Sequence, residues 1–367
     1  MLFGNYKKRP HDLLLRTIFL VGAVISAIMV FVLFTDYPSR KSNSDTSQQS
    51  VHKPETIILD FQHKPSYLII PVYADLNIGD RLKIIKNDSS SVLITVKEIE
   101  IDSKSYSCPR TRVLLDINGE KLSAYCGMQK LNSGGIRPLL THGINIGIEI
   151  TRLLFSRVGI WKESKWNSFA NFRLQKDLRV AIWEADKPIF QSAKTSFVVD
   201  QPIWTRDKFG NWLHGTNYGF HSATDIYASH HGVPEAVLTP VDGVVYKVYH
   251  KNGDPDSQMK DKVVNIHGKD IVGPTGERMF FRFFHLSTIA VSKGEEVKAG
   301  QVIGYTGHTG FAPRVGDHLH FEIRLNPSSF GLPYDDSIFS SIPVNPYYYL
   351  LEWWDQRNMA SNLAQSY

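Results

Sequence analysis

Two histidines lie two residues apart in residues 317–324, where the sequence is DHLHFEIR. Polar and apolar residues alternate through this segment, which is typical of a half-buried strand whose side chains i, i+2 and i+4 share one face. We therefore expect His318, His320 and Glu322 to share a face. The opposite face, expected in a core, holds Leu319, Phe321 and Ile323. Two imidazoles side by side on a rigid strand suit a metal site or a proton-transfer site. The alternative is a solvated strand face with two ordinary histidines, so the rest of the chain must decide.

Three other segments with possible functional residues precede this strand. His221 and Asp225 are separated by three small residues, His285 ends a phenylalanine-rich segment, and a glycine-rich turn occupies residues 304–310. In this order, the four elements resemble the lysostaphin-type (LytM-like) zinc endopeptidases, which cut peptide bridges in bacterial peptidoglycan. The resemblance covers about residues 202–350, less than half of the chain. It implies a LytM-like antiparallel β-sheet peptidase domain.

The resemblance also implies a role for each residue of the motif. His221, Asp225 and His320 match the family's three metal ligands, which hold one Zn²⁺, and His285 and His318 match its two catalytic histidines. Two imidazoles and one carboxylate form a typical open zinc site with a position left for water. The chain has no His-Glu-x-x-His motif, so a histidine must move the protons in place of a glutamate. Which of His285 and His318 acts as the base stays open.

Some positions depart from the family's pattern. Residues 222–224 are Ser, Ala and Thr where the family usually carries Gly or Pro-Gly, and Phe283 stands where a tyrosine is frequent. Residues 252–262 and 268–278 are expected to form loops over the cleft. His308 is interpreted as a turn residue, with a place in the substrate groove as the alternative.

Composition limits the possible partners. The chain has 367 residues, ordinary apolar and charged fractions, and a formal net charge of +5. This length has room for two domains. Basic residues do not form a stripe interleaved with aromatic residues, so nucleic acid is not expected as a partner.

The first residues predict a membrane anchor. Residues 1–16 form a basic tail, and residues 17–35 are an uncharged, mostly apolar run of the length that crosses a bilayer. We expect one transmembrane helix there; the alternative is a cleaved signal peptide. The basic flank predicts a cytoplasmic N-terminus with the rest of the chain outside. Residues 36–54 are polar and serine-rich, as in a flexible linker.

The two cysteines are expected to pair if the compartment is oxidising. Cys108 and Cys126 flank an expected hairpin around Asn118 and Gly119. A disulfide there would contribute about 3 kcal/mol in the chain-entropy model. The alternative is two buried thiols.

The fold class is expected to be mainly β, with two β-rich domains after the membrane helix. Residues 55–200 alternate like a β-sandwich or small barrel and hold no chemical cluster, so we interpret them as an accessory domain, either a spacer or a binding site for an envelope protein. Residues 201–350 form the peptidase domain, and residues 351–367 an aromatic, helical tail. The strands expected in the two domains are 57–61, 67–73, 81–85, 92–96, 144–150 and 178–183, then 244–249, 263–266, 279–284 and 302–305.

These expectations combine into one functional hypothesis. The chain is expected to be a zinc endopeptidase anchored in the bacterial inner membrane that cuts peptidoglycan cross-links on the periplasmic side. One alternative is a non-catalytic LytM-like activator or scaffold of other wall hydrolases, and another is a peptidase for a protein or a glycine bridge. The sequence leaves open which bond is cut and whether the accessory domain inhibits or recruits.

Overall fold

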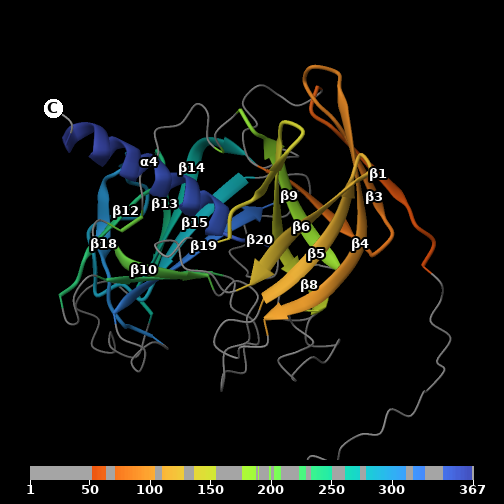
Figure 1. Cartoon of the computed structure of the whole chain (residues 1–367). Coiled ribbons are helices and arrows are strands. Elements are labelled where there is room, and N and C mark those ends of the chain that lie inside the picture. Colours follow the sequence, from red (N-terminus) through yellow and green to blue (C-terminus); the bar gives the residue numbers. More distant parts are fainter. Residues whose placement is uncertain are drawn as a thin grey trace, which may run out of the picture. The chain divides into compact units, whose positions relative to one another are not determined.

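Figure 1 shows the course of the chain in a computed structural model. The structure describes residues 52–62, 71–103, 110–127, 136–153, 176–186, 189, 198–199, 202–207, 223–228, 233–249, 261–272, 278–310, 317–326 and 342–365. The predicted membrane helix at 17–35, the basic tail, the linker, Cys108 and His221 all lie outside these residues. Within the described part of the chain, no helix is both long and apolar enough to span a bilayer.

A five-stranded sheet opens the described chain, in the order β1-β3-β4-β5-β6. Its strands are β1 (Thr56–Asp60), β3 (Arg81–Ile85), β4 (Ser91–Ser103), β5 (Arg110–Ile117) and β6 (Glu120–Gly127). The β5–β6 hairpin confirms the predicted turn, because Asn118 and Gly119 both have positive φ, 52° and 94°. This pair of left-handed residues suits the right-handed twist of the two strands.

A four-stranded sheet shares its core with the first sheet. Its order is β2-β9-β8-β7, with strands β2 (Val72–Leu76), β7 (Leu139–Thr141), β8 (Ile144–Thr151) and β9 (Leu178–Glu184). Alternate residues of both sheets enter one hydrophobic cluster, which includes Leu82, Ile94, Leu115, Ile146 and Val180. Two sheets that bury their inner faces together are the arrangement expected for a sandwich.

An eight-stranded sheet carries Asp225, His318 and His320, and β20 joins it by pairing with β19. Its order along the main path is β10-β11-β19-β15-β14-β13-β17. The bounds are β10 (Pro202–Asp207), β11 (Thr224–Ala228), β13 (Gly243–Tyr249), β14 (Val263–Val272), β15 (Arg278–Phe284), β17 (Glu296–Val297), β19 (His318–Asn326) and β20 (Ile342–Val344). Part of the loop expected at 268–278 is therefore strand, since β14 continues to Val272.

A small sheet and one helix complete the described fold. The small sheet has the order β12-β18-β16, with strands β12 (Ala236–Leu238), β16 (Thr288–Ile289) and β18 (Val302–Tyr305). Helix α4 (Tyr347–Gln365) runs past the strands of the large sheet in Figure 1, and its first turns are buried in the same core as that sheet. The sequence predicted an aromatic, helical tail at residues 351–367; the helix begins earlier, at Tyr347.

Helix α4 also touches the first half of the fold. The Oη atoms of Tyr73 and Tyr349 are 2.6 Å apart, and Glu149 accepts the backbone N–H of Asn345 at 2.7 Å. Residues Pro54–Tyr367 form one compact unit, within which two hydrophobic clusters are distinct. The mainly β prediction is confirmed, and the boundary near residue 200 stays a prediction.

Candidate active site

Strand β19 lies between β11 and β15, and the register places the motif residues side by side. Asp225 of β11 lies opposite His320, and Tyr227 lies opposite His318. On the other side of β19, Phe284 of β15 lies opposite His320. Because directly opposite residues in an antiparallel pair have neighbouring side chains, three strands bring their functional groups to one place on the sheet.

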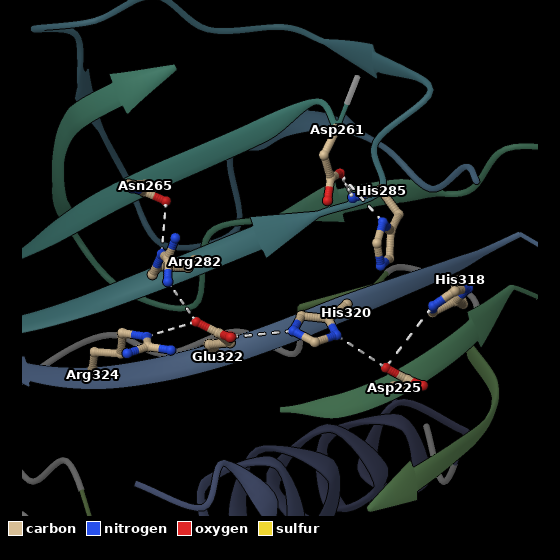
Figure 2. Close-up of polar contacts among 9 residues, drawn as sticks. All are labelled: Asp225, Asp261, Asn265, Arg282, His285, His318, His320, Glu322 and Arg324. Atoms are coloured by element: carbon tan, nitrogen blue, oxygen red, sulfur yellow. Dashed lines mark hydrogen bonds and ion pairs between the residues drawn. The ribbon is translucent and has the colours of Figure 1, made fainter. Parts of the chain in front are cut away.

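His320 lies between two carboxylates, as Figure 2 shows. Its Nδ1 is 3.5 Å from Oδ1 of Asp225, and its Nε2 is 3.3 Å from Oε1 of Glu322. Burial lowers the pKa of His320, but hydrogen bonds with Asp225 and Glu322 outweigh burial and raise this pKa to about 9. The two carboxylates therefore favour the protonated form of the imidazole.

Two arginines hold Glu322 in its ionised form. Arg324 Nε donates to Oε2 of Glu322 at 2.7 Å, and Arg282 Nη1 donates to the same oxygen at 2.8 Å. Burial raises the pKa of Glu322, but the two guanidinium groups and His320 bring it well below its usual value. Arg282 also donates to Asn265 at 3.3 Å. The carboxylate that faces His320 is thus fixed from its other side.

His318, one of the two predicted catalytic histidines, is almost completely buried, with 3% of its surface exposed. Its ring stacks on Tyr227 with 5.3 Å between centroids and 23° between planes. Its Nε2 lies 3.9 Å from Oδ1 of Asp225. The stacked tyrosine fixes the plane of the imidazole, so that this nitrogen faces the same carboxylate as His320.

His285, the other predicted catalytic histidine, approaches from the end of β15. Its ring centroid is 4.9 Å from that of His318 and 5.5 Å from that of His320. Its Nδ1 lies 2.9 Å from the carbonyl oxygen of Thr309. The ring of Phe284, the preceding residue, makes a T-shaped contact with His320, with centroids 5.0 Å apart. The structure thus brings together four of the five predicted site residues, and His221 lies outside the described residues.

The glycine-rich turn fits tightly against the corner that carries His285. A Cβ on Gly307 would lie 2.9 Å from the carbonyl oxygen of His285, and a Cβ on Gly310 would lie 2.7 Å from Cβ of Asp261. Real Cβ atoms do not approach other atoms so closely, so these two positions require glycine. The turn can therefore bring Thr309 within hydrogen-bonding distance of His285.

Two of the three predicted zinc ligands are described, and their donor atoms face each other. Asp225 and Nδ1 of His320 face each other, and Nε2 of His320 faces Glu322, which is the usual arrangement for a histidine that binds metal through one nitrogen and a carboxylate through the other. Restricted to the described residues, no group of three His, Cys, Asp or Glu side chains is placed to hold a metal. The third predicted ligand, His221, is not among these residues.

Two other sequence interpretations have outcomes in the structure. His308 is exposed, in the segment between β18 and β19, with its Nδ1 2.6 Å from Oδ1 of Asp317. Phe283 is fully buried in the core, so a tyrosine hydroxyl at this position would not face the histidines. The side chain of Phe284, one residue later, is the one beside His320.

Three residues near the site were not found from the sequence. Glu322 was placed on the correct strand face but given no role, although its position two residues after His320 in the alternation is a usable sign. Asp261 and Thr309 both contact His285. They lie 24 residues to either side of it in the chain, and neither has a local pattern that marks it.

With this geometry established, the chain can be compared with known proteins. Residues 219–331, less than a third of the chain, match the sequence model of Peptidase family M23. Over this segment the chain is similar to peptidase M23 domains.

Three curated relatives match shorter segments. An uncharacterized metalloprotease of Haemophilus influenzae is 31% identical over 106 residues, which are 29% of this chain and 19% of that protein. The peptidoglycan DD-endopeptidase ShyA of Vibrio cholerae is 43% identical over 56 residues, 15% of this chain and 13% of that protein. The glycyl-glycine endopeptidase ALE-1 of Staphylococcus capitis is 45% identical over 47 residues, 13% of this chain and 12% of that protein. The matched segments span less than a fifth of each relative.

Among solved structures, the catalytic domain of the antimicrobial peptidase lysostaphin from Staphylococcus simulans aligns with this chain. The alignment covers 40% of this chain and 90% of that domain, at 25% identity and a TM-score of 0.29.

Proposed function

We propose that the chain is a zinc-dependent endopeptidase that hydrolyses peptide cross-links of bacterial peptidoglycan. The observation that carries this proposal is the meeting of Asp225, His320, His318 and His285, from three adjacent strands, at one place on the large sheet. A peptidoglycan endopeptidase and a glycyl-glycine endopeptidase among the curated relatives support the substrate class.

Asp225, His320 and His221 would hold the zinc ion. Bound there, Zn²⁺ would lower the pKa of a coordinated water to about 7 and polarise the scissile carbonyl. Glu322 has a part in preparing His320 for this role. Its ionised carboxylate can only accept a hydrogen bond, so it favours a proton on Nε2 and leaves Nδ1, which faces Asp225, as the ligand atom.

The two other histidines would move protons and stabilise developing charge. The ring centroids of His285 and His318 lie 4.9 Å apart, and Nε2 of His318 lies 3.9 Å from Oδ1 of Asp225. An imidazole suits this task because its ordinary pKa is about 6.5, near the working pH. One ring would accept a proton from the attacking water while the other donates a hydrogen bond to the carbonyl oxygen.

The proposal includes a location. Residues 17–35 would anchor the chain in the inner membrane, with the peptidase domain on the periplasmic side. Residues 55–200 would position that domain or recruit an envelope protein. Fractionation of cells, with alkaline extraction of the membranes, tests the anchor; release of the chain into the soluble fraction would contradict it.

Digestion of purified peptidoglycan sacculi tests the activity. The full chain, purified in mild detergent, is incubated with sacculi with zinc or with a chelator, and the cross-linked fraction is measured by chromatography after muramidase treatment. We expect this fraction to fall only with zinc, and to stay unchanged with His318→Ala. If it stays unchanged with the wild-type chain while a known wall endopeptidase lowers it, the enzyme proposal fails.

The same assay distinguishes the non-catalytic alternative. An activator added by itself would leave the sacculi unchanged, but it would accelerate a second wall hydrolase. The His318→Ala variant would accelerate that hydrolase as much as the wild-type chain does. Mass spectrometry of the released fragments identifies the bond that is cut.

A further inference from the structure

His285 has a backbone conformation that is unusual for a residue with a side chain. Its φ is +63°, in the left-handed region where Cβ crowds the backbone and residues other than glycine are uncommon. Such a conformation persists where surrounding contacts hold it, and it is frequent at functional sites. Here it occurs at the end of β15, at the point where the ring must face the other two histidines.

Asp261 supplies the first contact that holds this conformation. Its Oδ1 accepts the backbone N–H of His285 at 2.8 Å and lies 3.3 Å from Nδ1 of the same residue. Asp261 lies just before β14, the neighbour of β15 in the sheet. One carboxylate oxygen therefore restrains both the main chain and the ring of His285 (Figure 2).

Thr309 supplies the second contact, through its backbone. Its carbonyl oxygen lies 2.9 Å from Nδ1 of His285. A carbonyl and a carboxylate oxygen can only accept hydrogen bonds, so Nδ1 carries the proton and the neutral ring keeps its lone pair on Nε2. Figure 2 shows the Nε2 end of the ring directed toward the side where His318 and His320 lie.

The Thr309 carbonyl is itself held in place. The Thr309 hydroxyl donates to the carbonyl of Leu286 at 3.0 Å and accepts the backbone N–H of Lys262 at 3.1 Å. The Lys262 carbonyl in turn accepts the N–H of Leu286 at 3.2 Å. The residues that follow His285 and Asp261 are thus bonded to each other and to the same threonine, so this corner has one defined geometry.

We propose that Asp261 is a positioning residue for His285. It holds His285 in the left-handed conformation and, with the Thr309 carbonyl, sets the tautomer that presents Nε2 to the reacting groups. This inference rests on the proposed function, because it assigns His285 the proton-transfer role. Asp261 acts through His285 and contacts neither metal nor substrate in this role. The plain alternative is that Asp261 only caps the end of a strand.

Two substitutions separate these possibilities, with a matched control elsewhere. Asp261→Ala removes the acceptor, whereas Asp261→Asn keeps an oxygen that can accept the backbone N–H. The control is Asp242→Ala, because Asp242 also caps a backbone N–H, that of Ala299 at 2.9 Å, outside the site. All variants are made in the full chain.

Kinetics provide the first readout. We expect Asp261→Ala to lower kcat on cross-linked muropeptides by about tenfold to a hundredfold, as for a misplaced catalytic group, while KM and bound zinc stay unchanged. Asp261→Asn is expected to retain most of the activity, and Asp242→Ala all of it. If Asp261→Ala has the wild-type kcat, or if both alanine variants lose kcat equally, the positioning role is wrong.

Should Asp261→Ala not fold, Asp261→Glu replaces it, because its longer side chain displaces the carboxylate. The same loss of kcat is then expected, and a wild-type kcat would again overturn the positioning role.

The tautomer provides a readout that does not depend on activity. In the metal-free chain labelled with ¹⁵N-histidine, long-range ¹H–¹⁵N spectra report which ring nitrogen of His285 carries the proton, with His285→Gln used for assignment. We expect the Nδ1-protonated form in the wild type and a mixture in Asp261→Ala. An Nε2-protonated wild type, or an unchanged tautomer in Asp261→Ala, overturns the inference even if the chain is active. The expected tautomer in an inactive wild-type chain would instead mean that the proposed function has failed and the positioning geometry has not.

Discussion

Asp225 lies directly opposite His320 in the pairing of β11 with β19, and 3.5 Å separate its Oδ1 from Nδ1 of the histidine. The backbone register alone sets this proximity, because opposite side chains in an antiparallel pair are about 4.5–5.5 Å apart at Cβ. The two groups are buried or nearly so, and rigid strands hold both. Two of the three proposed zinc ligands are therefore positioned by the sheet before any metal binds.

This arrangement predicts different results for neighbouring histidines. His320→Ala and Asp225→Ala should each lose stoichiometric zinc, because each removes a ligand from a three-residue site. His318→Ala should keep zinc and lose hydrolysis of cross-links, because Nε2 of His318 lies beside the proposed ligands but is not one of them. Metal content after dialysis, measured by mass spectrometry, and the sacculus assay check the two properties separately.

His142→Asn is a suitable control, since His142 is exposed in the turn between β7 and β8 and has a φ of 48° that asparagine tolerates. It should keep both zinc and activity. Equal metal loss in His318→Ala and His320→Ala would show that the two roles are assigned wrongly.

Glu322 provides the second prediction. Glu322→Gln removes the charge that faces Nε2 of His320 but keeps the shape of the side chain. Loss of such a partner behind a metal ligand typically lowers metal affinity by about tenfold to a hundredfold. We expect a loss of this size in zinc affinity, measured by competition with a chromogenic chelator. Activity at saturating zinc should fall less than the affinity does.

The matched control for this substitution is Glu296→Gln, which changes an exposed glutamate on β17. It should leave zinc affinity unchanged. If Glu322→Gln binds zinc as the wild type does, the carboxylate serves only to neutralise Arg282 and Arg324.

The sequence predicted the strand that carries His318 and His320 better than it predicted the contacts of that strand with the rest of the chain. Alternation in residues 317–324 was enough to place His318, His320 and Glu322 on one face, and the structure confirms this because Glu322 reaches Nε2 of His320. Local periodicity reports which side of a strand is buried. It carries no information about which distant strand pairs with it, so the pairing of Asp225 with His320 came from a family resemblance alone.

The contacts of His285 were beyond sequence reasoning for a different reason. Asp261 acts through one side-chain oxygen on a backbone N–H, and Thr309 acts through its carbonyl. A backbone carbonyl is present at every position, so its use leaves no mark in the residue types. The positive φ of His285 also has no signature, because glycine, the usual sign of such a conformation, is absent there.

The third prediction concerns the contact between α4 and β8. A Cβ on Gly147 would lie 2.4 Å from Cε2 of Tyr348, and the Tyr348 hydroxyl also donates to the carbonyl of Ile148 at 3.3 Å. Gly147→Ala must displace this ring from a packed core. We expect the free energy of unfolding to fall by about 1–3 kcal/mol, measured by urea denaturation of the full chain.

A double-mutant cycle with Tyr348→Ala identifies the cause of this loss. In the Tyr348→Ala background, the added methyl group has no ring to displace, so Gly147→Ala should cost little. Additive effects of the two substitutions would mean that the strain at Gly147 has another origin than Tyr348.

The last prediction follows from the Tyr73–Tyr349 pair that joins β2 to α4. Burial raises the pKa of both phenols well above the ordinary value. A raised folded-state pKa means that the native state keeps protons that the unfolded state releases. The stability contribution is therefore complete below about pH 10, the ordinary tyrosine pKa, and is lost as pH rises above it.

Each such tyrosine adds about 1.4 kcal/mol per pH unit to the decline once it is ionised in the unfolded chain. Tyr349→Phe should make the decline shallower by about this amount in urea titrations between pH 9 and 11. Equal slopes for the wild type and Tyr349→Phe would mean that the Tyr349 hydroxyl already meets solvent in the folded chain, and that this junction opens readily.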